Sequence, residues 1–62
     1  MPVITLEAGS LTKEQKEQLA KELTETASRI TGIPAQGFIT MLKENPYDNV
    51  AVGGTLISER GK

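Results

Sequence analysis

Hydrophobic residues follow a strand-like pattern at the start of the chain, a helical pattern in the middle and a strand-like pattern again afterwards. Residues 2–8 are rich in β-branched residues and are followed by Gly9, which is typical of a strand. Residues 38–43 form a second short run of the same kind. Pro2 is expected only at the start of its strand, because it has no N–H to donate to a neighbour.

A long amphipathic helix is predicted over residues 12–31. Thr12 and Gln15 have the spacing of a capping box, in which each side chain satisfies a backbone N–H of the other residue. Gly32 is a suitable residue for the helix C-terminus, and Pro34 prevents the helix from continuing. The apolar stripe repeats at steps of three and four residues and comprises Leu19, Leu23, Ala27 and Ile30.

Charged pairs and turn residues complete the local predictions. Glu17–Lys21 and Glu25–Arg29 stand at i,i+4, where each pair would stabilise the helix by a few tenths of a kcal/mol. Residues 45–49 have the composition of a turn. Residues 50–57 contain two short apolar runs separated by Gly53-Gly54, which predicts a small hairpin or an extended arm. A polar tail, residues 58–62, follows.

The order strand, helix, strand predicts one α+β domain, residues 1–62, with a parallel β-α-β unit and a right-handed crossover. Such a protomer leaves one face of its sheet uncovered. More apolar residues are available than one helix can cover, so other copies of the chain are expected to cover the rest. These residues are Ile4, Leu6, Ile39, Met41, Val50, Val52, Leu56 and Ile57.

The small size of the chain also points to assembly. A chain of 62 residues buries only about 60% of its unfolded surface. The chain has no cysteine and no histidine, which excludes disulfides and the usual zinc ligand sets, and it has only two aromatic residues. We therefore expect a homo-oligomer without metal or cofactor. Gly53-Gly54 lacks the further glycines and lysine of a phosphate-binding loop.

The charge balance excludes other classes of partner. The net charge is −1 and the sequence pI is about 5.3, so there is no basic field for nucleic acid. No apolar run approaches the ~20 residues of a membrane span. The N-terminus also lacks the features of a signal peptide. We expect a cytoplasmic protein with neither nucleic-acid nor membrane partners.

The dipeptide Met1-Pro2 is the candidate for chemistry. Removal of the initiator methionine favours a small second residue, and it would leave Pro2 as a free secondary amine. An α-amino group titrates near about 8 in model peptides, and desolvation lowers the pKa of an amine by disfavouring its charged form. A proline amine in an apolar pocket is therefore suited to act as a base near neutral pH. Taken alone, the dipeptide more often reflects only efficient methionine removal.

Several short motifs agree in spacing with one family. They are Pro2-Val-Ile-Thr-Leu, Leu11-Thr-Lys-Glu-Gln-Lys16 and Val52-Gly-Gly54, and together they span nearly the whole chain. The sequence resembles the 4-oxalocrotonate tautomerase family. The resemblance implies a tautomerase-fold protomer, dimers with a four-stranded sheet and, commonly, a hexamer built as a trimer of dimers. It also implies that Pro2 is a catalytic base that converts a conjugated enol or dienol acid, such as 2-hydroxymuconate, to its keto form.

The resemblance also assigns substrate-binding positions, and this sequence departs from the family pattern at three of them. Leu11 and Ile39 stand where the family commonly has arginines, and Val50 stands where it commonly has an aromatic residue. Turnover of a dicarboxylate is therefore in question, because apolar side chains cannot replace an arginine clamp. Lys43 shares a strand face with Ile39 and is either a substitute cation or, more often in such places, a surface charge.

Three explanations of these departures remain open. The pocket favours a less charged substrate, a partner chain in a mixed hexamer supplies arginines, or Lys43 takes their place. The alternative function is a non-catalytic assembly subunit that keeps the fold. Lys16 is assigned to the helix surface or a subunit contact. Tyr47 and Asn49 are candidates for lining the pocket, but an interface contact and a turn residue are the simpler assignments.

Overall fold

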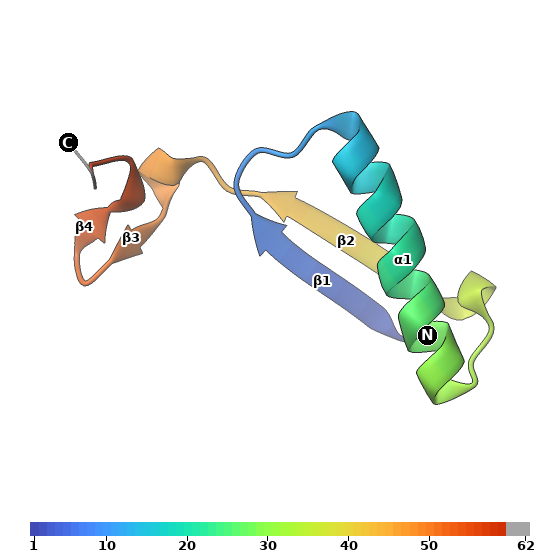
Figure 1. Ribbon diagram of the computed structural model, residues 1–62. Coiled ribbons are helices and arrows are strands. Elements are labelled where there is room, and N and C mark those ends of the chain that lie inside the picture. Colours follow the sequence, from blue (N-terminus) through green and yellow to red (C-terminus); the bar gives the residue numbers. More distant parts are fainter. Residues whose placement is uncertain (60–62) are drawn as a thin grey trace.

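The computed structural model describes residues 1–59, and its elements follow the predicted order (Figure 1). Strand β1, Val3–Ala8, leads to helix α1, Lys13–Thr31, and then to strand β2, Ile39–Glu44. A hairpin of β3, Ala51–Val52, and β4, Thr55–Leu56, follows. Three 3₁₀ turns, η1 (Ala35–Gly37), η2 (Tyr47–Asn49) and η3 (Ile57–Glu59), complete the described chain. The predicted α+β fold with a β-α-β unit is confirmed.

Both ends of α1 are fixed by the residues that the sequence indicated. The Thr12 hydroxyl accepts a hydrogen bond from the Gln15 N–H at 3.1 Å, and the Gln15 side-chain oxygen accepts one from the Thr12 N–H at 2.9 Å. Gly32 has a φ of 76°, and its N–H donates to the Ser28 carbonyl at 2.9 Å. A left-handed conformation of this kind strains most other residues, so a glycine here ends the helix cleanly.

Strands β1 and β2 are parallel, and α1 covers one face of the pair (Figure 1). Leu6 is paired with Leu42 across the strands, and both are partly buried on the helix side. On the same side the hydroxyls of Thr24 and Thr40 lie 2.8 Å apart and join the helix to β2. Strand β1 begins one residue later than predicted and ends at Ala8 as predicted, whereas β2 begins and ends one residue later, since Glu44 still pairs with Ala8.

One member of the predicted apolar stripe was placed wrongly. Leu19, Leu23 and Ala27 are partly buried, as expected, but Ile30 is 70% exposed. The sheet-facing side of the last helical turns instead carries Thr24, Ala27 and Ser28. Ile30 fitted the three-residue step of the stripe, but it lies outside the face of the helix that packs on the two strands.

The predicted ion pairs along the helix, Glu17–Lys21 and Glu25–Arg29, are absent from the described part of the chain. An ion pair joins Lys16 to Glu44, with the ammonium nitrogen 3.0 Å from Oε1. The other carboxylate oxygen of Glu44 accepts the Leu11 N–H at 3.1 Å. Glu44 therefore links the end of β2 to the loop and first turn that start α1. The surface position predicted for Lys16 is correct, and its partner lies within the same protomer.

The C-terminal arm is the predicted hairpin. Ala51 pairs with Leu56 and Val52 with Thr55. The turn between them is Gly53-Gly54, with φ values of 62° and 88°, a geometry that favours glycine at both positions. The arm extends away from the β-α-β unit (Figure 1). Part of the predicted polar tail belongs to η3, and residues 60–62 lie outside the described residues.

The protomer has no interior of its own. None of residues 1–59 is fully buried. The chain exposes 4799 Å², whereas a compact monomer of 6.7 kDa exposes about 3,900 Å². Its radius of gyration is 14.9 Å, against about 10.6 Å for a compact domain of this length. Within residues 1–59, no helix is both long and apolar enough to cross a membrane.

We predict that Glu44→Gln lowers the urea midpoint of unfolding at neutral pH, because it weakens the contacts to Lys16 and Leu11. These contacts, led by the Leu11 N–H hydrogen bond and followed by Lys16, lower the pKa of Glu44. A carboxylate with a lowered pKa contributes stability above the ordinary glutamate range and loses it as the pH falls through the lowered value. The difference between native and variant proteins should therefore shrink in acid.

The test is urea unfolding followed by circular dichroism, at one protein concentration and several pH values. Glu17→Gln, on an exposed helical glutamate, is the matched control and should leave the midpoint unchanged. Equal midpoints for the native protein and Glu44→Gln at neutral pH, or a difference that persists in acid, would contradict this role of Glu44.

Candidate active site

Pro2 lies at the N-terminal end of β1, next to the start of β2. Its carbonyl accepts a hydrogen bond from the Ile39 N–H at 3.0 Å. This bond continues the strand pairing one residue beyond Val3, which pairs with Ile39. Pro2 is partly buried, while Met1 is 86% exposed. The backbone therefore holds the proline in a defined position although the residue before it is exposed to solvent.

The sheet face that α1 does not cover is apolar near this end. Val3 is 57% exposed, Ile39 42% and Met41 45%. All three alternate with residues that face the helix, so they share one face. Phe38, just before β2, is also partly buried. Of the predicted substrate-binding residues, Ile39 is the one that the protomer brings next to Pro2.

Lys43 lies far from Pro2 within one protomer. It pairs with Glu7 near the opposite end of the two strands, whereas Ile39 pairs with Val3. Lys43 lies four residue steps along the strand from Ile39, which corresponds to about 13 Å. The Lys43 side chain is exposed. A role for Lys43 beside Pro2 therefore requires a second protomer.

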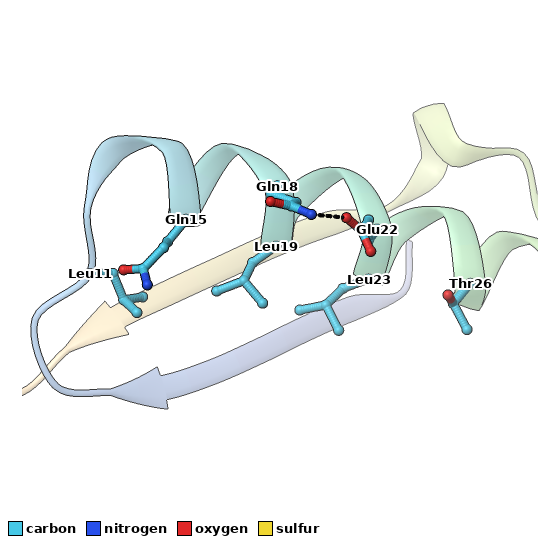
Figure 2. A pocket seen from close by; sticks show the side chains of 7 residues that line it. All are labelled: Leu11, Gln15, Gln18, Leu19, Glu22, Leu23 and Thr26. Carbon is cyan, nitrogen blue, oxygen red and sulfur yellow. Dashed lines mark hydrogen bonds between the residues drawn. The ribbon is translucent and has the colours of Figure 1, made fainter.

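Leu11 also lies at the end of the protomer away from Pro2. It precedes α1 and is held by the hydrogen bond from its N–H to Glu44. It lines an open groove of about 480 Å³ along the flank of the helix, in which Leu19 and Leu23 point toward β1 (Figure 2). Polar residues form the other edge of the groove, where Gln18 donates a hydrogen bond to Glu22 at 2.6 Å. The remaining lining residues are Gln15 and Thr26.

Val50 borders a third region, between the β-α-β unit and the C-terminal arm. A hollow of about 570 Å³ there is lined by Val50, Tyr47 and Asn49, among other residues. The Tyr47 ring lies against Gly9, because a Cβ atom on Gly9 would come within 2.7 Å of Cε1 of the ring. Tyr47 and Asn49 line this hollow, and Asn49 also belongs to the turn η2, in which its N–H donates to the Pro46 carbonyl at 2.8 Å.

Two contacts at this end of the sheet could not be found from the sequence. The glycine at position 9 leaves room for the Tyr47 ring, although by pattern it only ends a strand. Glu44 positions the loop that carries Leu11, although by pattern it is an ordinary polar residue after a strand. Both contacts join residues more than thirty positions apart, and no local signal marks them.

The geometry thus separates the predicted site residues into three places. Pro2 and Ile39 lie at one end of the sheet, Leu11 and Lys43 lie toward the other, and Val50 lies at the base of the arm. A proline held at the start of the first strand, a β-α-β unit and a C-terminal hairpin are together the features of the class of protein that the sequence resemblance implied.

Comparisons with known proteins agree with this class. Residues 2–60 match the family described as "Tautomerase enzyme". A probable tautomerase from Bacillus cereus is 33% identical over 61 residues, which covers 97% of this chain and 100% of that protein. The crystal structure of a 4-oxalocrotonate tautomerase homologue has 33% identity and a TM-score of 0.88, covering 100% of both chains.

The chain therefore belongs to the tautomerase family, and its predicted resemblance to 4-oxalocrotonate tautomerases is confirmed. A heterohexameric 4-oxalocrotonate tautomerase from Chloroflexus aurantiacus has a TM-score of 0.87, covering 97% of this chain and 98% of that one. Its identity is only 24%, so this likeness concerns the fold alone. The fold therefore occurs in a heterohexamer.

We predict that Gly9→Ala displaces the Tyr47 ring and destabilises the protein by about 1 kcal/mol, at the low end for an overpacked contact. Tyr47 is the only tyrosine and there is no tryptophan, so intrinsic fluorescence reports on this ring. Gly37→Ala is the matched control, since its Cβ would meet Ile33 at an ordinary 3.4 Å. Unchanged fluorescence and stability in Gly9→Ala would show that the ring does not need this space.

Proposed function

We propose that this protein is an isomerase that moves a proton along a conjugated enol or dienol acid, such as 2-hydroxymuconate, to give the keto form. Pro2, exposed as the N-terminus, is the proposed base. The observation that carries this proposal is the family match, which begins at residue 2 and runs to residue 60. The position of Pro2 on a hydrogen-bonded strand end supports it.

The proposed chemistry requires removal of Met1. With Met1 attached, the nitrogen of Pro2 is a tertiary amide that has no basic lone pair and no proton to give. Proline in second position favours removal of the methionine. The exposure of Met1, 86%, leaves it accessible to an aminopeptidase. Removal requires no rearrangement of β1, because the carbonyl of Pro2 and not its nitrogen makes the hydrogen bond to β2.

The free amine is proposed to carry out both proton transfers of the reaction. The neutral nitrogen takes the proton of the enol hydroxyl, and the electrons of the O–H bond form the carbonyl. The conjugated double bonds shift, and the ammonium returns a proton to the distal carbon of the diene. No proton is gained or lost overall, and the amine is neutral again at the end. The ring fixes the direction of the nitrogen, which keeps both transfers within reach.

We further propose that the active protein is a homo-oligomer, with a hexamer built as a trimer of dimers. The uncovered sheet face, the absence of fully buried residues in the described chain and the large exposed surface support assembly. Leu11, Lys43 and Val50 lie away from Pro2 in one protomer. They can join Pro2 and Ile39 in lining a substrate pocket only when they come from other copies.

The decisive variant is Pro2→Ala. We expect ketonisation of an enol acid to fall by at least about 10²-fold, the usual contribution of a positioned general base. Intact mass should show that the native chain begins at Pro2. Pro34→Ala is the matched control, because Pro34 lies in an exposed loop before η1 and only its carbonyl is used, by the Gly37 N–H.

Native mass spectrometry of each variant must show the same assembly before rates are compared. Equal rates in the native protein and Pro2→Ala would remove Pro2 as the base. A native chain without activity that becomes active only when mixed with an arginine-bearing relative would instead favour the non-catalytic assembly subunit.

A further inference from the structure

We infer that the site around Pro2 selects enol acids that carry one carboxylate and an apolar far end, and that it discriminates against dicarboxylates. This inference rests on the proposed function of Pro2. It concerns which substrates the same site accepts, and it follows from where the charged and apolar side chains lie in the protomer.

Three lysines lie at the end of the β-α-β unit that is opposite Pro2. Lys13 and Lys16 belong to the first turn of α1, at the opposite end of the sheet, and Lys16 is already paired with Glu44 at 3.0 Å. Lys43 lies in register with the acidic Glu7, about 13 Å along the strand from Ile39. None of these three ammonium groups can reach a substrate carboxylate held beside Pro2 of the same protomer.

The end of the helix near Pro2 does not favour a second negative charge. Because β1 and β2 are parallel, α1 runs back and its C-terminus lies at the end of the sheet where Pro2 begins (Figure 1). A helix C-terminus carries a partial negative charge. Arg29, in the last turn, is the one basic residue there among residues 1–59, and its side chain is exposed to water. The charge of an arginine at this position already interacts favourably with the carbonyls at the helix C-terminus.

The surface next to Pro2 is suited to an apolar substrate body. One continuous side of the sheet is formed by Ile39, Met41 and Val3, which are 42%, 45% and 57% exposed. An aliphatic or aromatic group that covers them gains about 25 cal/mol for each Å² removed from water. A carboxylate placed there would lose its hydration without an ion-pair partner, which is unfavourable.

In a homo-oligomer every copy brings the same side chains, so the charge that assembly adds to the pocket depends on which positions reach it. The positions proposed to reach the pocket from other copies are Leu11 and Val50, which are apolar, and Lys43. Among these positions, only Lys43 carries an ammonium group. A single ammonium satisfies the one carboxylate next to the reacting enol and leaves a second carboxylate without a charged partner.

The test uses two probes that differ only in the far carboxylate, 2-hydroxymuconate and 2-hydroxy-2,4-pentadienoate. The rates of the native, methionine-processed protein are divided by the uncatalysed ketonisation rate of each probe. We expect the corrected kcat/KM to favour the monocarboxylate by at least about tenfold, the usual effect of one missing charge-assisted hydrogen bond. Equal values, or a preference for the dicarboxylate, would overturn the inference.

Ile39→Arg supplies a cation next to Pro2, and Ile39→Gln is the matched uncharged control. The arginine variant should raise the relative kcat/KM for the dicarboxylate by about tenfold or more, and the glutamine variant should not. An equal shift in both would contradict a charge effect. If the native protein converts neither probe faster than Pro2→Ala does, the proposed function itself fails. If the native protein clearly converts one probe, the proposed function stands. The ratio of the two corrected kcat/KM values then tests the inference separately.

Discussion

The fold depends on apolar surface that one protomer cannot cover. A single helix lies over a two-stranded sheet, and even the best-covered residues, such as Leu6 and Leu42, are only partly buried. The opposite face keeps Ile39 and Met41 half exposed, and the arm adds Val52 at 56%. A chain of 62 residues without disulfides has no other means to compensate for the entropy lost on folding. The proposed assembly would therefore be part of folding in this protein and not a later step.

The same constraint connects the fold to the proposed chemistry. Pro2 is held by the bond between its carbonyl and the Ile39 N–H, so the strand pairing that starts the sheet also fixes the position of the proposed base. The loop that carries Leu11 is tied to β2 through Glu44, and the hollow at Val50 depends on the Tyr47 ring lying against Gly9. These contacts hold Pro2 and Ile39 together at one end of the sheet, Leu11 toward the other end and Val50 at the base of the arm. Neighbouring copies would have to complete the pocket, and desolvation of the amine would come from the same contacts.

Local chemistry made much of the fold predictable. The capping pair Thr12 and Gln15 and the left-handed Gly32 determine the helix through backbone hydrogen bonds within a few residues. Long-range contacts were not predictable. Ile30 fits the apolar step but is 70% exposed, and Lys16 pairs with Glu44, which lies 28 residues further along the chain. Pro2 and Ile39 were identified through family resemblance, and their adjacency follows from the strand register. No single residue in the sequence indicates this strand register.

The most direct test of this account follows assembly and folding together during dilution. Sedimentation velocity gives the mass of the particle, and far-ultraviolet circular dichroism on the same samples gives the helix content of α1. The account predicts that both signals decrease over the same range of protein concentration, because a separated protomer cannot keep its apolar faces exposed and remain folded. A monomer that retains the full helix signal and unfolds cooperatively on heating would contradict it.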